Sequence, residues 1–98
     1  MTIEVFRVIA GEEVIGDVTD NGDSITVENP AVVAVMPGED GTMQVRLGPL
    51  SPSTDDTKVT ISSSNILYRV TPKTDLLNYY NQIFGSGLIM PDKNIIGK

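Results

Sequence analysis

Acidic side chains are the most numerous groups in this sequence that could do chemistry, and they occur in clusters. Paired carboxylates can act as a general acid and base, or can hold a metal ion. Each cluster falls in a segment that we predict to be a turn, where aspartate is favoured because it hydrogen-bonds its own backbone. We therefore interpret these carboxylates as turn residues. The clusters are Glu12 and Glu13, Asp17, Asp20 and Asp23, Glu39 and Asp40, and Asp55 and Asp56.

The residue types that most catalytic sites need are missing from this chain. Its 98 residues include neither cysteine nor histidine, which removes the usual nucleophile and base pairs and thiolate metal sites. "DVTDNG" lacks the ligand spacing of a calcium loop, and "GSGLIM" is not followed by the lysine of a phosphate loop. We expect no enzyme activity, no metal site and no cofactor.

The charge distribution limits the partners that the chain could bind. The net charge is −6, with nine acids and one base in residues 1–45, and six bases and four acids in residues 46–98. A grip on nucleic acid by the whole surface is not expected, because phosphate binding depends on clustered cations; a local site remains open. No apolar run reaches the roughly 20 residues of a membrane span, and no secretory signal is evident, so we expect a cytoplasmic protein without membrane contact.

The stretch "SSSN", Ser62 to Asn65, is the second group of residues with potential function. It separates two strand-like runs and contains no glycine. One interpretation is a tight turn whose side chains hydrogen-bond the local backbone. The other is a turn that presents its polar groups to a ligand. The sequence alone leaves both open.

The elements that must position these groups are mostly strands. Asn21 and Gly22 predict a hairpin with a type I′ turn. Gly16, inside a strand, predicts a bend or the close approach of another backbone, and Pro30 predicts a bend or a sheet edge. The apolar, β-branched runs that we interpret as strands are residues 3–9, 13–18, 24–28, 31–36, 42–48, 58–62 and 65–70.

The hydrophobic period changes from strand to helix after Pro72. Leu76, Leu77, Tyr80, Ile83 and Phe84 share one face of a 3.6-residue helix. Gly85 can end this helix, and a threonine, at position 71 or 74, can cap its start. The domain prediction is therefore a barrel over 1–71, a helix over 72–85 packed on the same domain, and a tail over 86–98.

These elements predict a mainly β fold: a small, strongly bent, antiparallel five-stranded open barrel with one C-terminal α-helix. A sheet with so few strands stays open and leaves two edges with unpaired N–H and C=O groups. Pairing one edge with the opposite edge of the next subunit satisfies both edges. That contact is head-to-tail and generates a ring when the rotation closes.

Two segments resemble the motifs of the Sm-like (LSm) family, most closely those of short Sm-like proteins of tailed cyanobacterial phages. "GEEVIG", Gly11 to Gly16, has the spacing of the first Sm motif, and Val18 stands where that motif carries a leucine. "ISSSNILYRV" resembles the second motif, and the similarity covers residues 3–70. The matching positions in the second motif are Ile61, Asn65, Ile66, Leu67 and Tyr68.

The resemblance implies a homo-oligomeric ring that binds single-stranded RNA near its pore, in the host cytoplasm if the protein is of phage origin. In the family, one turn of each motif grips or stacks on a base. Carried over to this chain, the candidate RNA-binding residues are Asp23 and Ser24 in the first turn, and Ser62, Ser63, Ser64 and Asn65 in the second.

Three departures from the family pattern motivate an alternative. Ser62 replaces the arginine of the second motif, Ser24 and Ile25 replace a Met-Asn pair, and the helix follows the barrel instead of preceding it. A serine hydroxyl neither stacks on a base nor pairs with phosphate as a guanidinium does. The alternative is a structural or adaptor ring that binds a protein partner through the C-terminal helix.

Some other polar and aromatic residues have two interpretations each. Arg69 and Lys73 are the bases nearest "SSSN"; they either rim a pore or are solvated ends of a strand and a helix. Tyr79 and Tyr80 either stack on bases or, as we prefer for Tyr80, pack in the core, and we interpret Tyr68 as a packed strand residue.

Overall fold

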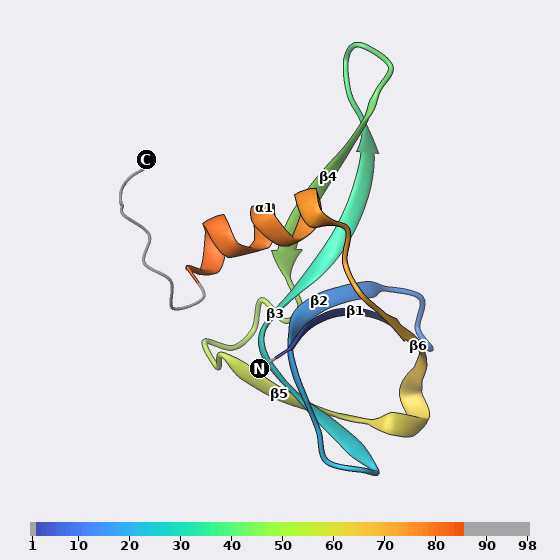
Figure 1. Cartoon of the computed structure of the whole chain (residues 1–98), viewed down its shortest axis with the longest axis vertical. Helices are drawn as coiled ribbons and strands as arrows, with labels where there is room; N and C mark the ends of the chain where they lie inside the picture. The colour runs from blue at the N-terminus through green and yellow to red at the C-terminus, as the bar shows by residue number, and fades with distance from the viewer. Residues whose placement is uncertain (1, 86–98) are drawn as a thin grey trace.

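The fold is an antiparallel six-stranded sheet followed by one helix, in a computed structural model that describes residues 2–85 (Figure 1). The sheet curls strongly but stays open, with strand order β4-β3-β2-β1-β6 and with β5 also paired to β3. The predicted fold class is thus confirmed, whereas the predicted tail, 86–98, lies outside the described residues. The elements are β1 (Ile3–Val8), β2 (Glu13–Asp20), β3 (Ser24–Pro37), β4 (Met43–Pro49), β5 (Lys58–Ser62), the 3₁₀ turn η1 (Ser63–Asn65), β6 (Ile66–Val70) and α1 (Thr74–Phe84).

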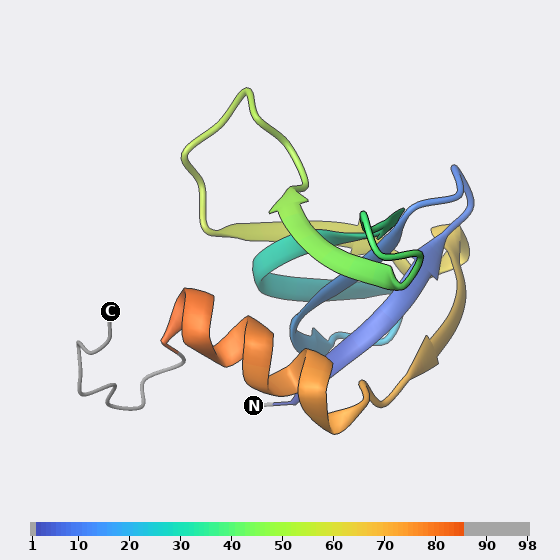
Figure 2. The ribbon, with the colours of Figure 1, turned by 90° about the horizontal axis from the view of Figure 1, so that it is seen from above.

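β4 and β5 lie in line along the same edge of β3. Lys58 at the start of β5 is opposite Glu28, and Pro49 at the end of β4 is opposite Ala31. The loop 50–57 joins them and stands away from the sheet (Figure 2). This loop divides one edge into two strands, and the sheet has six strands in all.

β3 joins two segments that the sequence analysis treated as separate strands. Asn29 takes a left-handed conformation, with φ of 52°, directly before Pro30. At this point β3 changes its partner from β5 to β4. The bend predicted at Pro30 is confirmed, but the strand continues through it to Pro37.

Gly16 lies where β3 approaches β2 most closely. A Cβ atom at this position would overlap Cγ1 of Val27 and would lie 3.3 Å from the carbonyl oxygen of Glu28. The β2–β3 register also shifts between Ile15 and Asp17. The close approach predicted from this glycine is confirmed.

Two apolar clusters form on the two faces of the curled sheet. The first fills the inside of the curl, and the second lies between the sheet and α1. Fully or nearly fully buried members of the first are Phe6, Val14, Val18, Ile25 and Val27. Those of the second are Val5, Ile15, Ala31 and Tyr80.

α1 packs on the sheet through a narrower face than predicted. Leu76, Tyr80 and Phe84 join the second cluster, whereas Ile83 is 48% exposed. Gly85 ends the helix with φ of 65°, as predicted. The predicted threonine cap is wrong: the residue before the helix is Lys73, which makes no side-chain capping bond.

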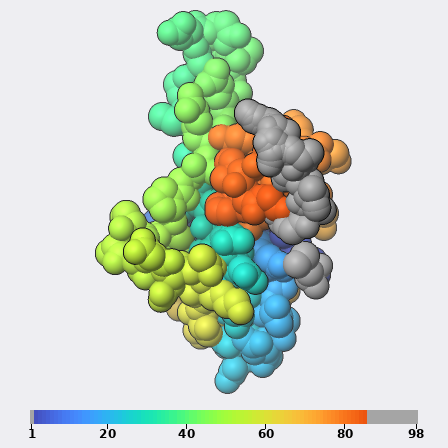
Figure 3. All heavy atoms as spheres, turned by 90° about the vertical axis from the view of Figure 1, so that its left-hand side faces the viewer, coloured from blue at the N-terminus to red at the C-terminus, as the bar shows by residue number. Residues whose placement is uncertain are grey.

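The end of β3 and the start of β4 project beyond the rest of the sheet. Pairing between β2 and β3 stops at Val33, so the remainder of β3 pairs with β4 alone. We call this projecting hairpin, residues 34–46, the arm; it stands out above α1 in the space-filling view (Figure 3). It carries large apolar side chains in exposed positions: Val35, Met36, Met43 and Val45.

Candidate functional site

The structure brings the two candidate turns into contact. Ser63 joins them: its N–H donates to the carbonyl oxygen of Asp23 at 2.9 Å, and its hydroxyl donates to that of Gly22 at 3.1 Å. Ser24 and Ser62 are also direct partners in the β3–β5 register. We call residues 21–24 and 62–65 the paired turns. All six candidate residues therefore lie in one small region, although forty residues separate the turns in sequence.

The "SSSN" turn needs no glycine because none of its residues takes a positive φ. Ser63 to Asn65 form a single 3₁₀ turn, which Ile66 closes by donating its N–H to the carbonyl oxygen of Ser63. The hydroxyls of Ser62 and Ser64 lie 2.9 Å apart and share a hydrogen bond. All three serine hydroxyls are therefore engaged, but none of them bonds the backbone of its own turn as the first interpretation required.

The "DNGD" hairpin is present, but its turn type differs from the prediction. Asn21 N–H donates to the carbonyl oxygen of Ser24 at 2.8 Å, so Gly22 and Asp23 occupy the two central positions. Gly22 has φ of 96°, whereas Asn21 and Asp23 are not in the left-handed region. A type I′ turn requires positive φ at both central residues, so that prediction is wrong.

The paired turns leave some polar groups available. Asp23, Ser62, Ser64 and Asn65 are exposed, and Ser24 and Ser63 are half-buried. Within residues 2–85, the side-chain amide of Asn65 and the carboxylate of Asp23 make no hydrogen bond or ion pair. An amide and a carboxylate with free donors and acceptors can bind the edges of an unstacked base.

A small pocket adjoins the paired turns. It has a volume of about 180 Å³ and is lined by Ile25, Ser63, Ile66, Tyr68 and Arg69. The pocket combines an aromatic ring, a hydroxyl and a guanidinium, the three kinds of group that recognise nucleobases in single strands.

The cation of this pocket is already paired. Arg69 binds both carboxylate oxygens of Glu4, at 2.7 and 3.1 Å, and one oxygen of Asp20 at 2.7 Å. These hydrogen bonds raise the pKa of Arg69 above its usual range, and with the N–H of Gly22 they lower the pKa of Asp20. Arg69 therefore ties β6 to β1 and β2, and it contributes little free positive charge to the site.

Tyr68 is not packed in the strand as we predicted. Its ring is 39% exposed, and its hydroxyl donates to Glu13 at 2.8 Å and accepts from Arg7 at 2.9 Å. The register explains the contact, since Tyr68 is opposite Arg7, which in turn is opposite Glu13. Knowledge of that register could have identified the network from the sequence.

Tyr80 is a core residue, as preferred. It is 1% exposed, and its hydroxyl donates to the carbonyl oxygen of Asn29 at 2.8 Å. Burial, together with the negative charges of Asp17 and Glu28, raises the pKa of Tyr80 to about 12. Tyr80 thereby fastens α1 to the bend in β3.

The acidic clusters include residues that stabilise turns, in line with our interpretation. Asp20 accepts the N–H of Gly22 at 2.8 Å, and Asp40 accepts both the N–H and the hydroxyl of Thr42. Across residues 2–85, no three acidic side chains converge as a metal site requires.

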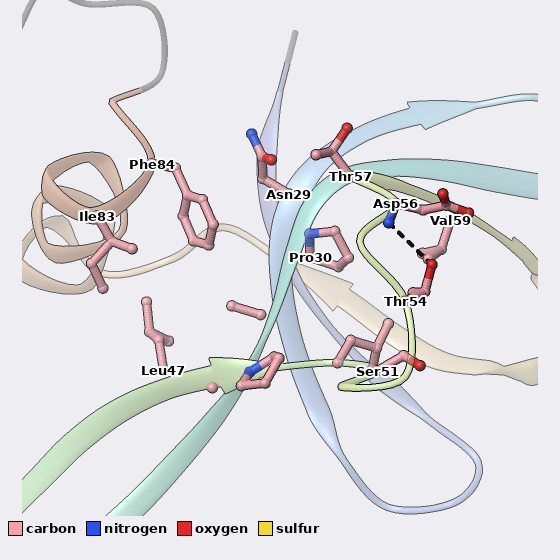
Figure 4. Close-up of a pocket in the computed structure, with 14 residues that line it drawn as sticks. Asn29, Pro30, Leu47, Ser51, Thr54, Asp56, Thr57, Val59, Ile83 and Phe84 are labelled. Atoms are coloured by element: carbon pink, nitrogen blue, oxygen red, sulfur yellow. Dashed lines mark hydrogen bonds between the residues drawn. The ribbon is translucent and has the colours of Figure 1, made fainter.

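A second pocket lies at the C-terminal end of α1 (Figure 4). It has a volume of about 350 Å³, and Phe84 and Ile83 face Leu47 and Pro30 across it. The loop 50–57 borders its other side through Ser51, Thr54, Asp56 and Thr57.

The function of this site cannot be assigned from a membrane-spanning helix or from a similar protein of known function. No helix within residues 2–85 has the length and hydrophobicity to cross a bilayer. No protein-family model matches the sequence, and no curated protein matches it either.

Proposed function

We propose that this protein is a non-catalytic subunit of an Sm-like homo-oligomeric ring, and that the ring binds single-stranded RNA at the paired turns. The observation that carries the proposal is the contact of Ser63 with Gly22 and Asp23, which unites the turns of the two motif-like segments. Each subunit of a ring would contribute one such pair of turns, so a single strand would meet the same site repeatedly.

The free edges of the sheet support ring formation. Within residues 2–85, β6 pairs only with β1, and β4 and β5 pair only with β3. β6 also exposes Leu67 and Val70, which are 61% and 47% accessible. Edge strands with unpaired backbone groups and exposed apolar side chains favour pairing with another chain. Because the two edges differ, their contact is head-to-tail and gives a ring when the rotation between subunits closes.

The groups at the paired turns favour bases over backbone phosphates. Asn65 offers an amide and the adjoining pocket offers the ring of Tyr68, whereas Arg69 is held by two carboxylates. A stacked base contributes about 1–3 kcal/mol, and phosphate contacts contribute most of the salt dependence. We therefore expect weak binding that depends modestly on salt.

Fluorescence anisotropy tests the RNA proposal. U-rich and A-rich oligonucleotides are titrated with protein at low and at physiological salt. We expect salt-sensitive binding that Asn65→Ala weakens several-fold without changing the mass of the oligomer. Asn78→Ala, an exposed amide on α1, is the matched control. Absence of salt-sensitive binding at high micromolar protein would rule out the RNA function.

The second candidate is an adaptor ring that binds a protein partner through α1. The charges at the paired turns favour it, because Asp23 lies within them, Asp20 lies beside them and Arg69 is neutralised. The pocket of Figure 4 provides an apolar surface at the end of α1, with Ile83 48% exposed.

A comparison of two neighbouring substitutions tests the adaptor candidate. Ile83→Asp places a charge in the pocket, whereas Gln82→Asp places the same charge on an exposed position one residue away. In a pull-down from cell lysate, a specific protein retained by wild type and Gln82→Asp but lost with Ile83→Asp would favour the adaptor. Equal capture by both variants would contradict it.

A further inference from the structure

A groove lies between the arm, the end of β6 and the first turns of α1. It has a volume of about 490 Å³, larger than the pocket beside the paired turns. Its apolar lining comes from all three elements: Val33, Val35, Val45, Val70 and Leu76. Three charged side chains also border it: Glu13, Lys73 and Asp75.

The two faces of the arm differ. Val35 and Val45 are opposite each other in the β3–β4 register and line the subunit's own groove. Since side chains alternate along a strand, Ala34, Met36 and Arg46 project from the other face. Met36 is 51% exposed, and Arg46 is exposed and makes no ion pair within residues 2–85. The arm thus presents an apolar side chain and a free cation away from its own subunit.

The register of the sheet places the arm of a neighbour at this groove. Suppose that β6 pairs with the β5 edge of a neighbour in the antiparallel sense of every other pair in the sheet. The neighbour's residues before Lys58 then extend past Val70. Because β4 continues the β5 edge along β3, the strand that extends past Val70 is the neighbour's β4. Val70, Thr71 and Pro72 line the groove at that end.

Charge complementarity also supports the arm of a neighbouring subunit as the occupant of the groove. Of the two carboxylates at the groove, Glu13 is occupied by Tyr68 and lies 3.7 Å from Arg7. Asp75 makes no ion pair within residues 2–85, and only its own backbone neighbour, the N–H of Leu76, bonds to it. Arg46 of the arm likewise makes no ion pair within residues 2–85, so an unpaired cation on the arm matches an unpaired carboxylate at the groove. Opposite charges at matching positions fix the register of an interface.

We propose that the groove of each subunit receives the arm of the next subunit, with Arg46 of the arm paired to Asp75 and Met36 packed on the apolar lining. This inference rests on the proposed ring, and it names the second surface that holds the ring together beside the paired edges. Since every subunit carries one arm and one groove, the contact is head-to-tail and repeats around the ring.

A charge exchange tests this contact, with the mass of the oligomer as the readout. Arg46→Glu and Asp75→Arg each place like charges together, so each variant should dissociate at a protein concentration about tenfold higher than wild type does. The double variant should return to the wild-type value. Asp55→Arg, an equal change of charge in the loop 50–57, is the control and should behave as wild type.

A disulfide trap provides a second readout that does not depend on assembly strength. The chain contains no cysteine, so Arg46→Cys with Asp75→Cys introduces the only thiols, and peptide mapping identifies which two positions each disulfide joins. Mild oxidation should give a ladder of covalent multimers, and Asp55→Cys with Asp75→Cys should not.

The outcomes separate the arm contact from the ring. If wild type is an oligomer, and either the single charge variants assemble normally or the Cys pair gives no specific ladder, the arm contact is wrong and the ring stands. Failure of the double variant to recover would also overturn it. A wild-type monomer at every concentration would remove the ring itself, and with it this proposal.

Discussion

Both halves of β3 contain large apolar residues, but their surroundings are very different. In residues 24–28, Ile25 and Val27 are completely buried, because β2 and β5 flank the strand and the sheet curls over them. In the arm, Val35 and Met36 are 55% and 51% exposed, because only β4 remains beside the strand. The same residue types thus form a core at one end of β3 and an exposed surface at the other.

This difference indicates what the arm is for. A two-stranded extension with exposed valines and methionines gains little from its own subunit, and a hairpin without a packed face is only marginally stable. The first half of β3 is needed to fold the subunit. The second half is exposed in the single subunit, and only the proposed ring would bury it.

The largest expected effect is a difference in the free energy of unfolding between side-chain truncations in the two halves of β3. Ile25→Ala leaves a cavity in the inner cluster and should lower the free energy of unfolding by about 2–5 kcal/mol. Met36→Ala removes an exposed side chain and should change it by less than about 0.5 kcal/mol. Urea unfolding at low protein concentration, where subunits are separate, gives both values. Equal losses would contradict the division of β3.

Two glycine substitutions, one in β2 and one in β4, test the same difference between the two halves of β3. Gly16→Ala forces a Cβ into Val27 beside the first half of β3, and overpacking of this kind costs about 1–3 kcal/mol. Gly48→Ala, beside Val32 in the second half, meets no atom within 4 Å. We expect its effect on unfolding to be less than about 0.5 kcal/mol. A Gly16→Ala protein as stable as wild type would show that the two halves of β3 are equally tolerant.

Tyr80 joins the two halves at the bend, and the loss of its hydroxyl should be the smallest of the three destabilising effects, below those of Ile25→Ala and Gly16→Ala. Tyr80→Phe loses the hydrogen bond to Asn29 and should cost about 1 kcal/mol at neutral pH. The loss of stability from Tyr80 at alkaline pH is a more specific test of its environment.

The raised pKa of Tyr80, about 12, sets the alkaline window. In the unfolded chain the phenol ionises near pH 10, whereas the native state keeps it neutral up to about 12. Stability from this group is therefore present below pH 10 and is lost as the pH rises from 10 to 12, by at most about 1.4 kcal/mol per unit. Subtracting the pH dependence of Tyr80→Phe from that of wild type isolates this contribution. Parallel curves would show that Tyr80 titrates normally.

Local patterns in the sequence predicted much of this fold. Alternating β-branched runs identified the strands, and Gly16 and Gly85 had the roles expected of them. The strands depend on residues that are close in sequence, Gly85 on a backbone conformation that only glycine adopts easily, and Gly16 on the absence of a Cβ where β3 comes close.

The predictions that failed depended on contacts between distant residues. The strands before and after Pro30 were treated as separate, but the left-handed Asn29 and the change of partner from β5 to β4 allow β3 to continue through the bend. Tyr68 was predicted to be a packed strand residue, but it contacts Arg7 and Glu13. These contacts follow from the register of three strands, which the local sequence does not indicate.

The candidate site was predictable in its residues but not in its geometry. Resemblance to two motifs selected the turns, and the spacing gave no indication that Ser63 would bridge them. The pairing of Arg69 with Glu4 and Asp20 was also beyond the sequence, because these residues are 65 and 49 positions apart.

The most direct test of the account is the mass of the purified protein in solution. Native mass spectrometry, checked by sedimentation over a wide range of concentrations, measures the number of chains in the particle and reveals any RNA that accompanies it. The account predicts one closed assembly of several identical subunits. A single 10.5 kDa chain at every concentration would contradict the pairing of the exposed sheet edges, on which the ring depends.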